Sequence, residues 1–325
     1  MNRVYYPKLP DTIHGKPERS AIGSDTHISA AIKRPNFSES RGHSMKTSTE
    51  IGSIAQHIGE ERAVEATAKA GFDAWDFSMF TMGSDGWAAP GMIAAGRHLV
   101  TARHLRRIGL DNGILCNQSH APFPSPKMLD YLKPAIECTA EAGGKICIIH
   151  PDNDSTPEQN AEMYARLLPF AKGCGVKIAT ENMWNWDSKT DEALFAACAT
   201  PESFSAHLDA VGDADFVACL DIGHAEMRGV GTSAVAMIHT LGERLQALHI
   251  HDNDRRYDLH QIPFSQSIDF APIVKALQEI HYAGYFTLEA DAFLRQYTED
   301  TLMTGLRRMS ETARKLAAMF TDALE

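Results

Sequence analysis

Short apolar runs alternate with amphipathic segments along the chain from about Met45 onward. Runs such as KICIIH (145–150) and DFVACLD (215–221) carry apolar residues on both faces, as strands buried in a parallel sheet do. Segments such as GEERAVEATAKAGF (59–72) place apolar residues at helical spacing and close on a glycine. The pattern therefore predicts βα units repeated along the chain.

The repeat predicts eight strands and eight helical regions. The predicted strands are KTSTEIGSI (46–54), FDAWDF (72–77), NGILCNQS (112–119), KICIIH (145–150), VKIATE (176–181), DFVACLD (215–221), LQALHIH (245–251) and YFTLEAD (285–291). The predicted helical regions are about 59–72, 91–108, 126–144, 157–175, 190–210, 232–243, 269–284 and 300–320.

This count, with the 325 − 44 = 281 residues that carry the pattern, suits a (β/α)8 barrel of the α/β class, which typically takes about 250 residues. A doubly wound open sheet is the competing fold, but no GxGxxG motif follows the first predicted strand. We therefore expect a TIM barrel at residues 45–325. Residues 1–44 lack the periodicity and are rich in Pro, Ser, His and charge, so we expect an N-terminal extension or arm there.

Composition narrows the expected partners. The formal net charge of −11 argues against nucleic acid, since such binding relies on Lys and Arg to neutralise phosphates. The six cysteines form no CxxC pair, which favours reduced, packed side chains in a cytoplasmic protein. No apolar run reaches the roughly 18 residues that a membrane span needs. We expect a small-molecule substrate and no membrane partner.

Chemically active residues follow the apolar part of six of the eight predicted strands. They are Ser119 and His120, His150, Glu181 and Asn182, Asp221 and His224, His249 and His251, and Glu289. The C-terminal ends of barrel strands meet at one mouth, where active sites lie. A single histidine or glutamate there is usually only solvated or hydrogen-bonded. Several carboxylates confined together repel each other unless a cation lies between them, so the convergence predicts a divalent metal site.

The stretch HIHDND (249–254) narrows the choice of imidazole ligand. His249 and His251 share one face because side chains alternate along a strand. His251 lies nearer the mouth, so we expect it to be the ligand and His249 a deeper neighbour, while the reverse assignment stays open. Mixed carboxylate and imidazole ligands suit Mn, Mg, Co or Zn, and the sequence does not choose among them.

Four motifs together resemble the xylose-isomerase-like barrel superfamily: ENMWNW (181–186), CLDIGHA (219–225), HIHDND with the later DLH (258–260), and FTLEAD (286–291). The resemblance runs from about Lys46 to the last helix. This superfamily includes sugar and sugar-phosphate isomerases and epimerases, and also the type IV AP endonucleases. The resemblance to its ketose epimerases implies one metal held by Glu181, Asp221, His251 and Glu289. It also implies that Glu181 and Glu289 act as the acid–base pair and that His224 contacts the substrate.

The resemblance to the endonucleases implies a different reading, with three zinc ions. Their ligands would be His120, His150 and Glu181; Glu181, Asp221, His251 and Glu289; and His224, Asp258 and His260. Against this stand the negative charge, the lack of basic loops after the strands, and the short spacing of seven residues from His251 to Asp258. A third class, a binding or structural barrel without catalysis, predicts no metal.

The sequence thus favours a metal-dependent isomerase or epimerase of carbohydrate metabolism, acting on a sugar, sugar phosphate or polyol through an enediolate. Candidate substrate contacts besides His224 are His120, His150, Trp184, Asp258, His260 and Arg255. Trp184 and Trp186 either stack on a sugar face or pack the rim, and Arg255 and Arg256 either bind phosphate or are solvated. Analogy with the family suggests a homo-oligomer.

Overall fold

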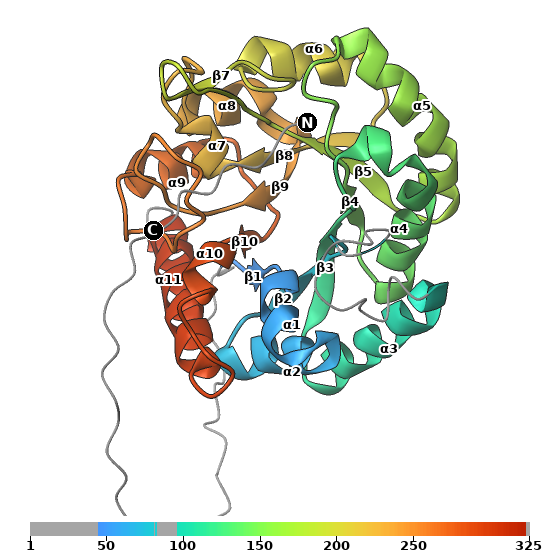
Figure 1. Ribbon diagram of the computed structural model, residues 1–325, viewed down its shortest axis with the longest axis vertical. Helices are drawn as coiled ribbons and strands as arrows, with labels where there is room; N and C mark the ends of the chain where they lie inside the picture. Colours follow the sequence, from blue (N-terminus) through green and yellow to red (C-terminus); the bar gives the residue numbers. More distant parts are fainter. Residues whose placement is uncertain (1–44, 81, 83–95, 323–325) are drawn as a thin grey trace, which may run out of the picture. The chain divides into compact units, whose positions relative to one another are not determined.

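The computed structural model describes residues 45–80, 82 and 96–322, and within them eight parallel strands alternate with helices. The strands are β1 (Thr47–Thr49), β2 (Ala74–Ser78), β3 (Leu115–His120), β4 (Ile146–Ile148), β5 (Lys177–Glu181), β8 (Phe216–Asp221), β9 (Leu245–His249) and β10 (Phe286–Leu288). They form a ring when viewed down the molecule (Figure 1).

Strand pairing closes the ring. Six strands pair in the order β2-β3-β4-β5-β8-β9, and β1 pairs with β10. Single parallel bridges, Glu50 with Asp76 and Ile250 with Leu288, join the two sheets at both edges. Residues matched across β8 and β9 include Asp221 and His249, so neighbouring strand ends lie level. The predicted (β/α)8 barrel is confirmed, and the open doubly wound sheet is excluded.

Helices surround the strands in Figure 1, and apolar side chains fill the layer between them. The longer helices are α2 (Glu60–Ala70), α3 (His98–Asp111), α4 (Leu129–Ala142), α5 (Pro157–Gly173), α6 (Pro201–Val211), α8 (Ala234–Leu241), α9 (Phe270–Glu279) and α11 (Leu302–Asp322). The short ones are α1 (Gly52–Ile58), α7 (Ile222–Ala225), α10 (Asp291–Leu294) and the 3-10 turns η2 (Ser125–Lys127) and η3 (Gly242–Arg244). Local signals set their ends: a capping box of Thr156 and Gln159 begins α5, and left-handed Gly71 ends α2.

Two predicted elements were wrong in extent. The first strand ends at Thr49, because the Glu50 carboxylate accepts the backbone N–H of Ser53 and the chain turns into α1. The region predicted as helix from about residue 190 instead begins with an antiparallel hairpin of β6 (Asn185–Asp187) and β7 (Glu192–Leu194). The helix of this region, α6, starts only at Pro201, after the cap Thr200.

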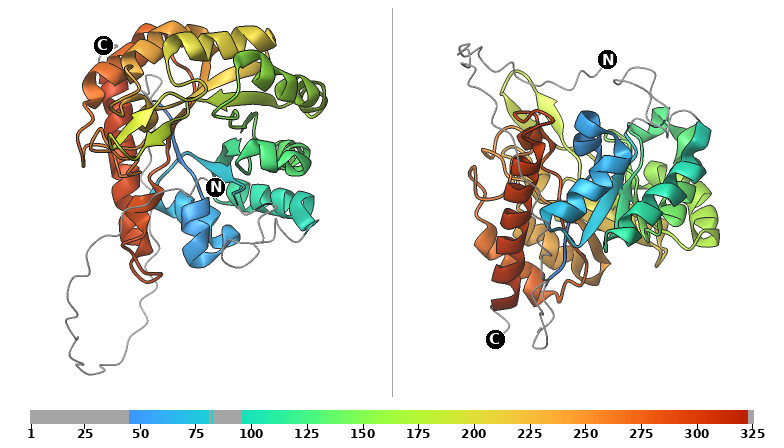
Figure 2. Two further views of the ribbon diagram at one scale, coloured as in Figure 1. Left: turned by 45° about the horizontal axis from the view of Figure 1, so that its top comes forward. Right: turned by 90° about the horizontal axis from the view of Figure 1, so that it is seen from below.

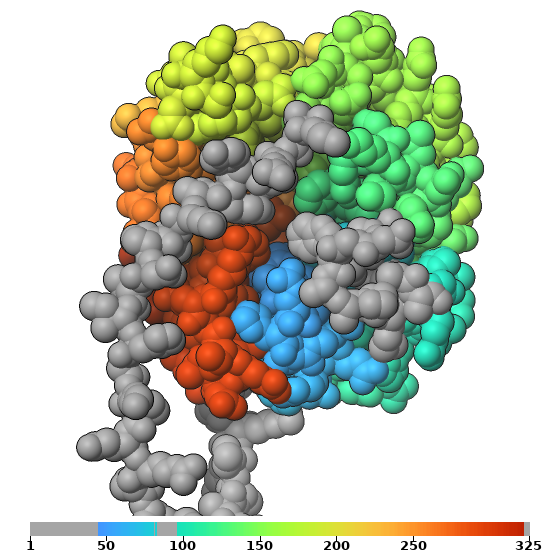
Figure 3. Space-filling model, viewed as in Figure 1, coloured from blue at the N-terminus to red at the C-terminus, as the bar shows by residue number. Residues whose placement is uncertain are grey.

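The hairpin β6–β7 follows the C-terminal end of β5, as α1 follows that of β1, so both lie at the same end of the barrel. The right-hand view of Figure 2 shows them there, in yellow-green and blue. This end of the barrel is the mouth that the sequence pattern predicted. In the space-filling view, the red surface of α11 lies beside the blue surface of α1 and α2, where the ring closes (Figure 3).

Some predictions fall outside the described residues. The N-terminal extension, residues 1–44, lies there and stays a prediction, as does the part of the helix predicted at 91–95. All six cysteines are described and free of disulfides, and five are buried. None of the helices in the described ranges combines the length and apolar character needed to cross a membrane.

Candidate metal and catalytic site

Three strand-end carboxylates and one imidazole meet in the mouth of the barrel. Glu181 (β5), Asp221 (β8), His249 (β9) and Glu289 (after β10) are buried, and each offers a ligand atom within 4.8 Å of the others. His249 Nδ1 lies 3.1 Å from Glu181 Oε2 and 3.3 Å from Glu289 Oε2. We refer to these four residues as the inner cluster.

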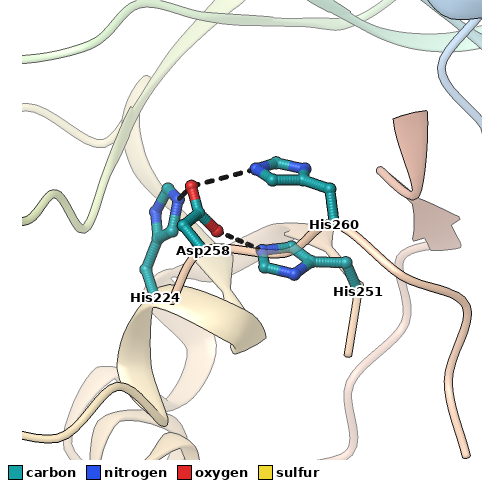
Figure 4. A group of neighbouring side chains, drawn as sticks. All are labelled: His224, His251, Asp258 and His260. Carbon is teal, nitrogen blue, oxygen red and sulfur yellow. Dashed lines mark hydrogen bonds and ion pairs between the residues drawn. The ribbon is translucent and has the colours of Figure 1, made fainter. Parts of the chain in front are cut away.

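A second set of ligand atoms lies beside the inner cluster. His224 from α7, His251 after β9, and Asp258 and His260 from the following loop also gather within 4.8 Å, and we call these four the outer cluster. The Asp258 carboxylate is its centre (Figure 4), with Nε2 atoms at 3.1 Å (His260), 3.3 Å (His251) and 3.4 Å (His224). The short spacing of seven residues between His251 and Asp258 therefore does not prevent these four side chains from meeting.

Asp221 connects the two clusters. Its Oδ1 lies 3.1 Å from His251 Nε2 and accepts the backbone N–H of His224 at 2.7 Å. Of the four ligands implied by the epimerase resemblance, Glu181, Asp221 and Glu289 therefore fall in the inner cluster. His251 falls in the outer cluster but contacts Asp221, and His249 takes the inner position.

His120 and His150 lie on the other side of Glu181. Their Nε2 atoms are 2.8 Å apart, and Nε2 of His150 is 3.3 Å from Glu181 Oε2. His120, Glu181 and His249 form a third group of possible ligands within 4.8 Å. All nine side-chain types of the three-metal reading thus surround one mouth.

Backbone carbonyls fix three of the imidazoles. The Nδ1 atoms of His120, His224 and His260 lie 2.9, 2.9 and 2.8 Å from the carbonyl oxygens of Ala121, Asn182 and Glu289. An Nδ1–H that donates to a carbonyl leaves Nε2 as the ring atom that faces the site. This is the usual arrangement of a metal-ligating histidine and its supporting hydrogen bond.

Several buried polar atoms lack a hydrogen-bond partner here. They are Asp221 Oδ2 and His251 Nδ1, and also His251 Nε2 and Asp258 Oδ1, which lie 3.3 Å apart without the geometry of a hydrogen bond. Buried polar atoms are rarely left unpaired, because the loss of hydration is costly. Oxygen and imidazole nitrogen donors in this number suit a divalent cation such as Mn, Mg, Co or Zn. The residues present therefore fit the predicted metal.

The two glutamates of the inner cluster differ in electrostatics. Burial would raise the pKa of Glu181, but His249 and His150 outweigh it and hold that pKa well below the usual range. Burial raises the pKa of Glu289 to about 8, and His249 and His260 only partly oppose it. One carboxyl group thus favours the ionised form at neutral pH while its neighbour favours the protonated form.

Opposite charges also set the protonation of the outer cluster. Burial would lower the pKa of His224, but Asp221 and Asp258 raise it to about 10. Burial would raise the pKa of Asp258, yet His260 and His224 hold it well below the usual range. The outer cluster is therefore a compact set of opposite charges, in which His224 is buried and Asp258 and His260 are partly exposed.

Only part of the HIHDND stretch faces the site. The Asp252 carboxylate accepts three backbone N–H groups, from Ser265, Gln266 and Ile268. Asn253 donates to the carbonyl oxygen of Gly223 at 2.9 Å. Asp252 and Asn253, which follow the two histidines, thus organise loops, and neither belongs to the groups of possible metal ligands in the described part of the chain.

The loop after β9 also uses its arginines structurally. Arg255 pairs with Glu226 at 2.7 Å, and Arg256 pairs with Asp191 in the hairpin turn. Tyr257 donates a hydrogen bond to the same Asp191 at 2.9 Å and packs on Trp186 with ring centroids 5.5 Å apart. The loop therefore fastens the hairpin β6–β7 to the barrel.

The aromatic residues after β5 line the same region. Trp184 lies between Trp186 and His224, with ring centroids at 6.1 and 6.3 Å. Both tryptophans are partly exposed. Tyr257 extends this aromatic row and was not predicted, because a lone tyrosine in a polar loop carries no signal. Asp76, whose Oδ2 lies 3.4 Å from His249 Nε2, was not predicted either.

The comparisons with known proteins agree with this architecture. Residues 64–312 match the family model described as xylose isomerase-like TIM barrel, and the chain belongs to that family. Among curated proteins, the uncharacterized protein MJ1311 of Methanocaldococcus jannaschii is 22% identical over 249 residues, which cover 70% of this chain and 78% of that protein.

Solved structures of similar fold include one protein named as epimerase-like and one named as an epimerase. A D-tagatose 3-epimerase-like protein superposes with a TM-score of 0.66 at 18% identity, covering 86% of this chain and 100% of its own. The 3-keto-D-glucoside 4-epimerase YcjR from E. coli gives 0.60 at 14% identity, covering 82% and 99%. At these identities the likeness establishes the fold alone.

Proposed function

We propose that the protein is a divalent-metal-dependent isomerase or epimerase that moves a proton next to the carbonyl of a sugar or related hydroxy-carbonyl compound. The observation that carries the proposal is the pair Glu181 and Glu289. They face one imidazole nitrogen, at 3.1 and 3.3 Å, and their pKa values are displaced in opposite directions. Neighbouring carboxyl groups held in opposite protonation states are typical of acid–base pairs.

The inner cluster is the proposed cation site. Glu181, Asp221 and Glu289 would supply oxygens, and either His251, as the family resemblance implies, or His249, which lies closer to the glutamates, would supply nitrogen. A divalent cation acts as a Lewis acid toward the negative charge that develops on an enediolate oxygen. Each carboxylate has two oxygens, so one can hold the cation while the other exchanges a proton.

In this proposal the two glutamates move the proton, and other residues of the mouth orient the substrate. Ionised Glu181 removes the proton from the carbon next to the carbonyl, and Glu289 returns a proton. Return to the opposite face of the same carbon gives an epimer, and return to the neighbouring carbon gives an aldose–ketose isomer. The hydroxyl groups of the substrate would be hydrogen-bonded by His224, His260 and Asp258. Trp184 would pack on an apolar face of the sugar.

The fold neighbours support a sugar as substrate, since their names specify a ketose-type and a 3-keto sugar epimerase. Phosphate recognition has less support. The Arg255 side chain is paired with Glu226 rather than free at the mouth, so its proposed role as a substrate contact requires that ion pair to open. We therefore propose an unphosphorylated substrate.

Proton transfer can be tested without knowing the natural substrate. The protein is stripped with a chelator, reloaded separately with Mn, Mg, Co or Zn, and incubated in D2O with a panel of ketoses, aldoses and keto-sugars. We expect deuterium next to the carbonyl of at least one compound, only in the metal-loaded protein. Metal-loaded protein that exchanges no proton across the panel contradicts the proposal.

The outer cluster supports a second candidate, a metal-dependent phosphodiester hydrolase acting on abasic DNA. His224, Asp258 and His260 meet as the three-metal reading requires, despite the short loop before them. Several metals in one site suit the activation of water and stabilisation of a leaving oxygen. The net charge of −11 opposes it.

Metal stoichiometry and cleavage separate the two candidates. One ion per chain with no cleavage of abasic duplex DNA by zinc-loaded protein supports proton transfer. Three ions with cleavage that weakens as salt increases supports the hydrolase. A chain that binds no cation supports neither and favours a barrel without catalysis. A cytoplasmic location and a homo-oligomer stay predictions, to be checked by fractionation and light scattering.

A further inference from the structure

Asp76, in the middle of β2, is a carboxylate with no exposed surface. Its Oδ2 accepts a hydrogen bond from Gln118 Nε2 at 2.9 Å and lies 3.4 Å from His249 Nε2. Its Oδ1 is buried without a hydrogen-bond partner. Burying a carboxylate with so few partners is costly, so Asp76 is not explained by packing.

A β-bulge orients the donor to Asp76. Between β2 and β3, Trp75 pairs with Cys116 and Asp76 pairs with Gln118, so Asn117 is an extra residue. The bulge lets the consecutive side chains of Asn117 and Gln118 both reach residues on other strands of the ring. Asn117 Nδ2 donates to Thr287 Oγ1 at 3.1 Å, and Gln118 Nε2 also reaches the carbonyl oxygen of Leu248 at 3.3 Å.

Asn117 also fixes which way the Gln118 amide points. Asn117 Nδ2 donates to Gln118 Oε1 at 3.2 Å, and Asn117 Oδ1 accepts from Ser48 Oγ at 2.6 Å. With its oxygen facing Asn117, Gln118 turns its NH2 group toward Asp76. The hydrogen bond from Gln118 therefore holds the Asp76 carboxylate in one orientation.

His249 links Asp76 to the inner cluster. One ring nitrogen, Nε2, faces Asp76, and the other, Nδ1, faces both Glu181 and Glu289. The ring is fully buried and stacks on His120, with centroids 5.4 Å apart and planes at 25°. A buried imidazole held at both nitrogens has one rotamer available.

We propose that Asp76 is a positioning residue: through His249 it sets the spacing of Glu181 and Glu289 and thereby the cation affinity of the inner cluster. This inference rests on the proposed metal site. It holds whether His249 binds the cation through Nδ1 or only spaces the two carboxylates. Removal of a group that orients a metal ligand commonly changes metal affinity by about 10- to 100-fold.

The first test measures Mn²⁺ binding by the full-length chain. Asp76→Asn keeps the size of the side chain and removes the charged acceptor. We expect its Mn²⁺ dissociation constant, from the EPR signal of free Mn²⁺, to rise about 10- to 100-fold while the far-UV spectrum and melting temperature stay near wild type. Wild-type affinity in folded Asp76→Asn overturns the proposal.

Glu50→Gln is the matched control. Glu50 is a buried carboxylate on the adjacent strand end, but it is hydrogen-bonded to Ser53 and Ser78 and has no contact with His249. We expect wild-type Mn²⁺ affinity. An equal loss in both variants indicates a general effect of buried charge and also overturns the specific role of Asp76. If Asp76→Asn does not fold, Gln118→Met, which removes the donor to Asp76, serves in its place and should show a smaller loss.

A second readout needs no metal. In metal-free protein with ¹⁵N-labelled histidine, the Nε2 resonance of His249, assigned by its loss in His249→Gln, reports its hydrogen-bond acceptor. We expect it to shift in Asp76→Asn and to stay in place in Glu50→Gln. If the wild-type chain binds no cation, the proposed metal function fails, and this spectrum alone decides whether Asp76 orients His249. An unchanged resonance overturns the inference.

Discussion

Gly223 and His251 approach so closely that a side chain at position 223 has no room. A Cβ placed there would overlap Cε1, Nε2 and Nδ1 of the His251 ring. The backbone turn from β8 into α7 therefore packs directly on an imidazole of the outer cluster. Asn253 holds the turn in place through its hydrogen bond to the Gly223 carbonyl oxygen.

This approach makes Gly223→Ala a sharp probe of the outer cluster. We expect the methyl group to displace His251, to lower the free energy of unfolding by about 1–3 kcal/mol, and to reduce the number of bound metal ions or their affinity. Urea unfolding and metal analysis measure both. Gly173→Ala is the control, because a Cβ there meets nothing within 4 Å. Unchanged metal binding in Gly223→Ala would show that His251 tolerates displacement.

Glu181→Gln and Glu289→Gln test the acid–base pair. Each substitution keeps the shape of the side chain and removes the group that accepts or donates a proton. We expect the rate of deuterium exchange to fall at least about 10²- to 10⁴-fold in either variant. Metal content is measured alongside, so that loss of the cation is distinguished from loss of the proton carrier. Full exchange in either variant rules out a mechanism with two carboxylates.

Metal affinity should depend on pH through Glu289. Burial raises its pKa to about 8, so below that pH a proton competes with the cation for this carboxyl group. We expect the apparent dissociation constant to fall by up to about tenfold per pH unit as the pH rises toward 8 and then to level off. In Glu289→Gln, the number of protons released on metal binding should fall by about one. Calorimetric titrations in several buffers count the protons released.

Asp252→Ala should destabilise the barrel without touching the proposed ligands. Three backbone N–H groups lose their buried acceptor, and the one that is itself buried, that of Ile268, costs roughly 1–3 kcal/mol when it is left unpaired. We expect the free energy of unfolding to fall by about 1–3 kcal/mol. Asp209→Ala, at an exposed carboxylate paired with Arg244, should change it by less than about 1 kcal/mol. Equal effects of the two substitutions would argue against the loop-organising role of Asp252.

The alternation of apolar runs and amphipathic segments was enough to predict the barrel. Each strand from β2 to β10 that belongs to the ring lies within or close to a predicted run, because burial on both faces leaves a strong compositional mark. Short segments fixed by tertiary contacts left no such mark. The hairpin β6–β7 depends on the link from Asp191 to Arg256 and Tyr257, residues more than sixty positions away.

The residues of the candidate site could be predicted where a reactive side chain directly follows an apolar strand. Glu181, Asp221 and Glu289 follow apolar runs directly, and the structure brings them together. The sequence could not place His249 and His251, because alternation puts both on one face and leaves depth undetermined. Asp76 was not predicted for a different reason. It lies inside a strand, between the apolar residues Trp75 and Phe77, and not at a strand end, where we expected the reactive side chains.

The hairpin β6–β7 pairs only with itself in the described sheets and joins the barrel through side chains of two loops, those after β4 and β9. Its residues can therefore be exchanged without disturbing the register of the strand ring. Evolution or an engineer could retune which compound is accepted by rewriting about ten positions here, while the reactive groups stay on a scaffold that folds independently of that choice.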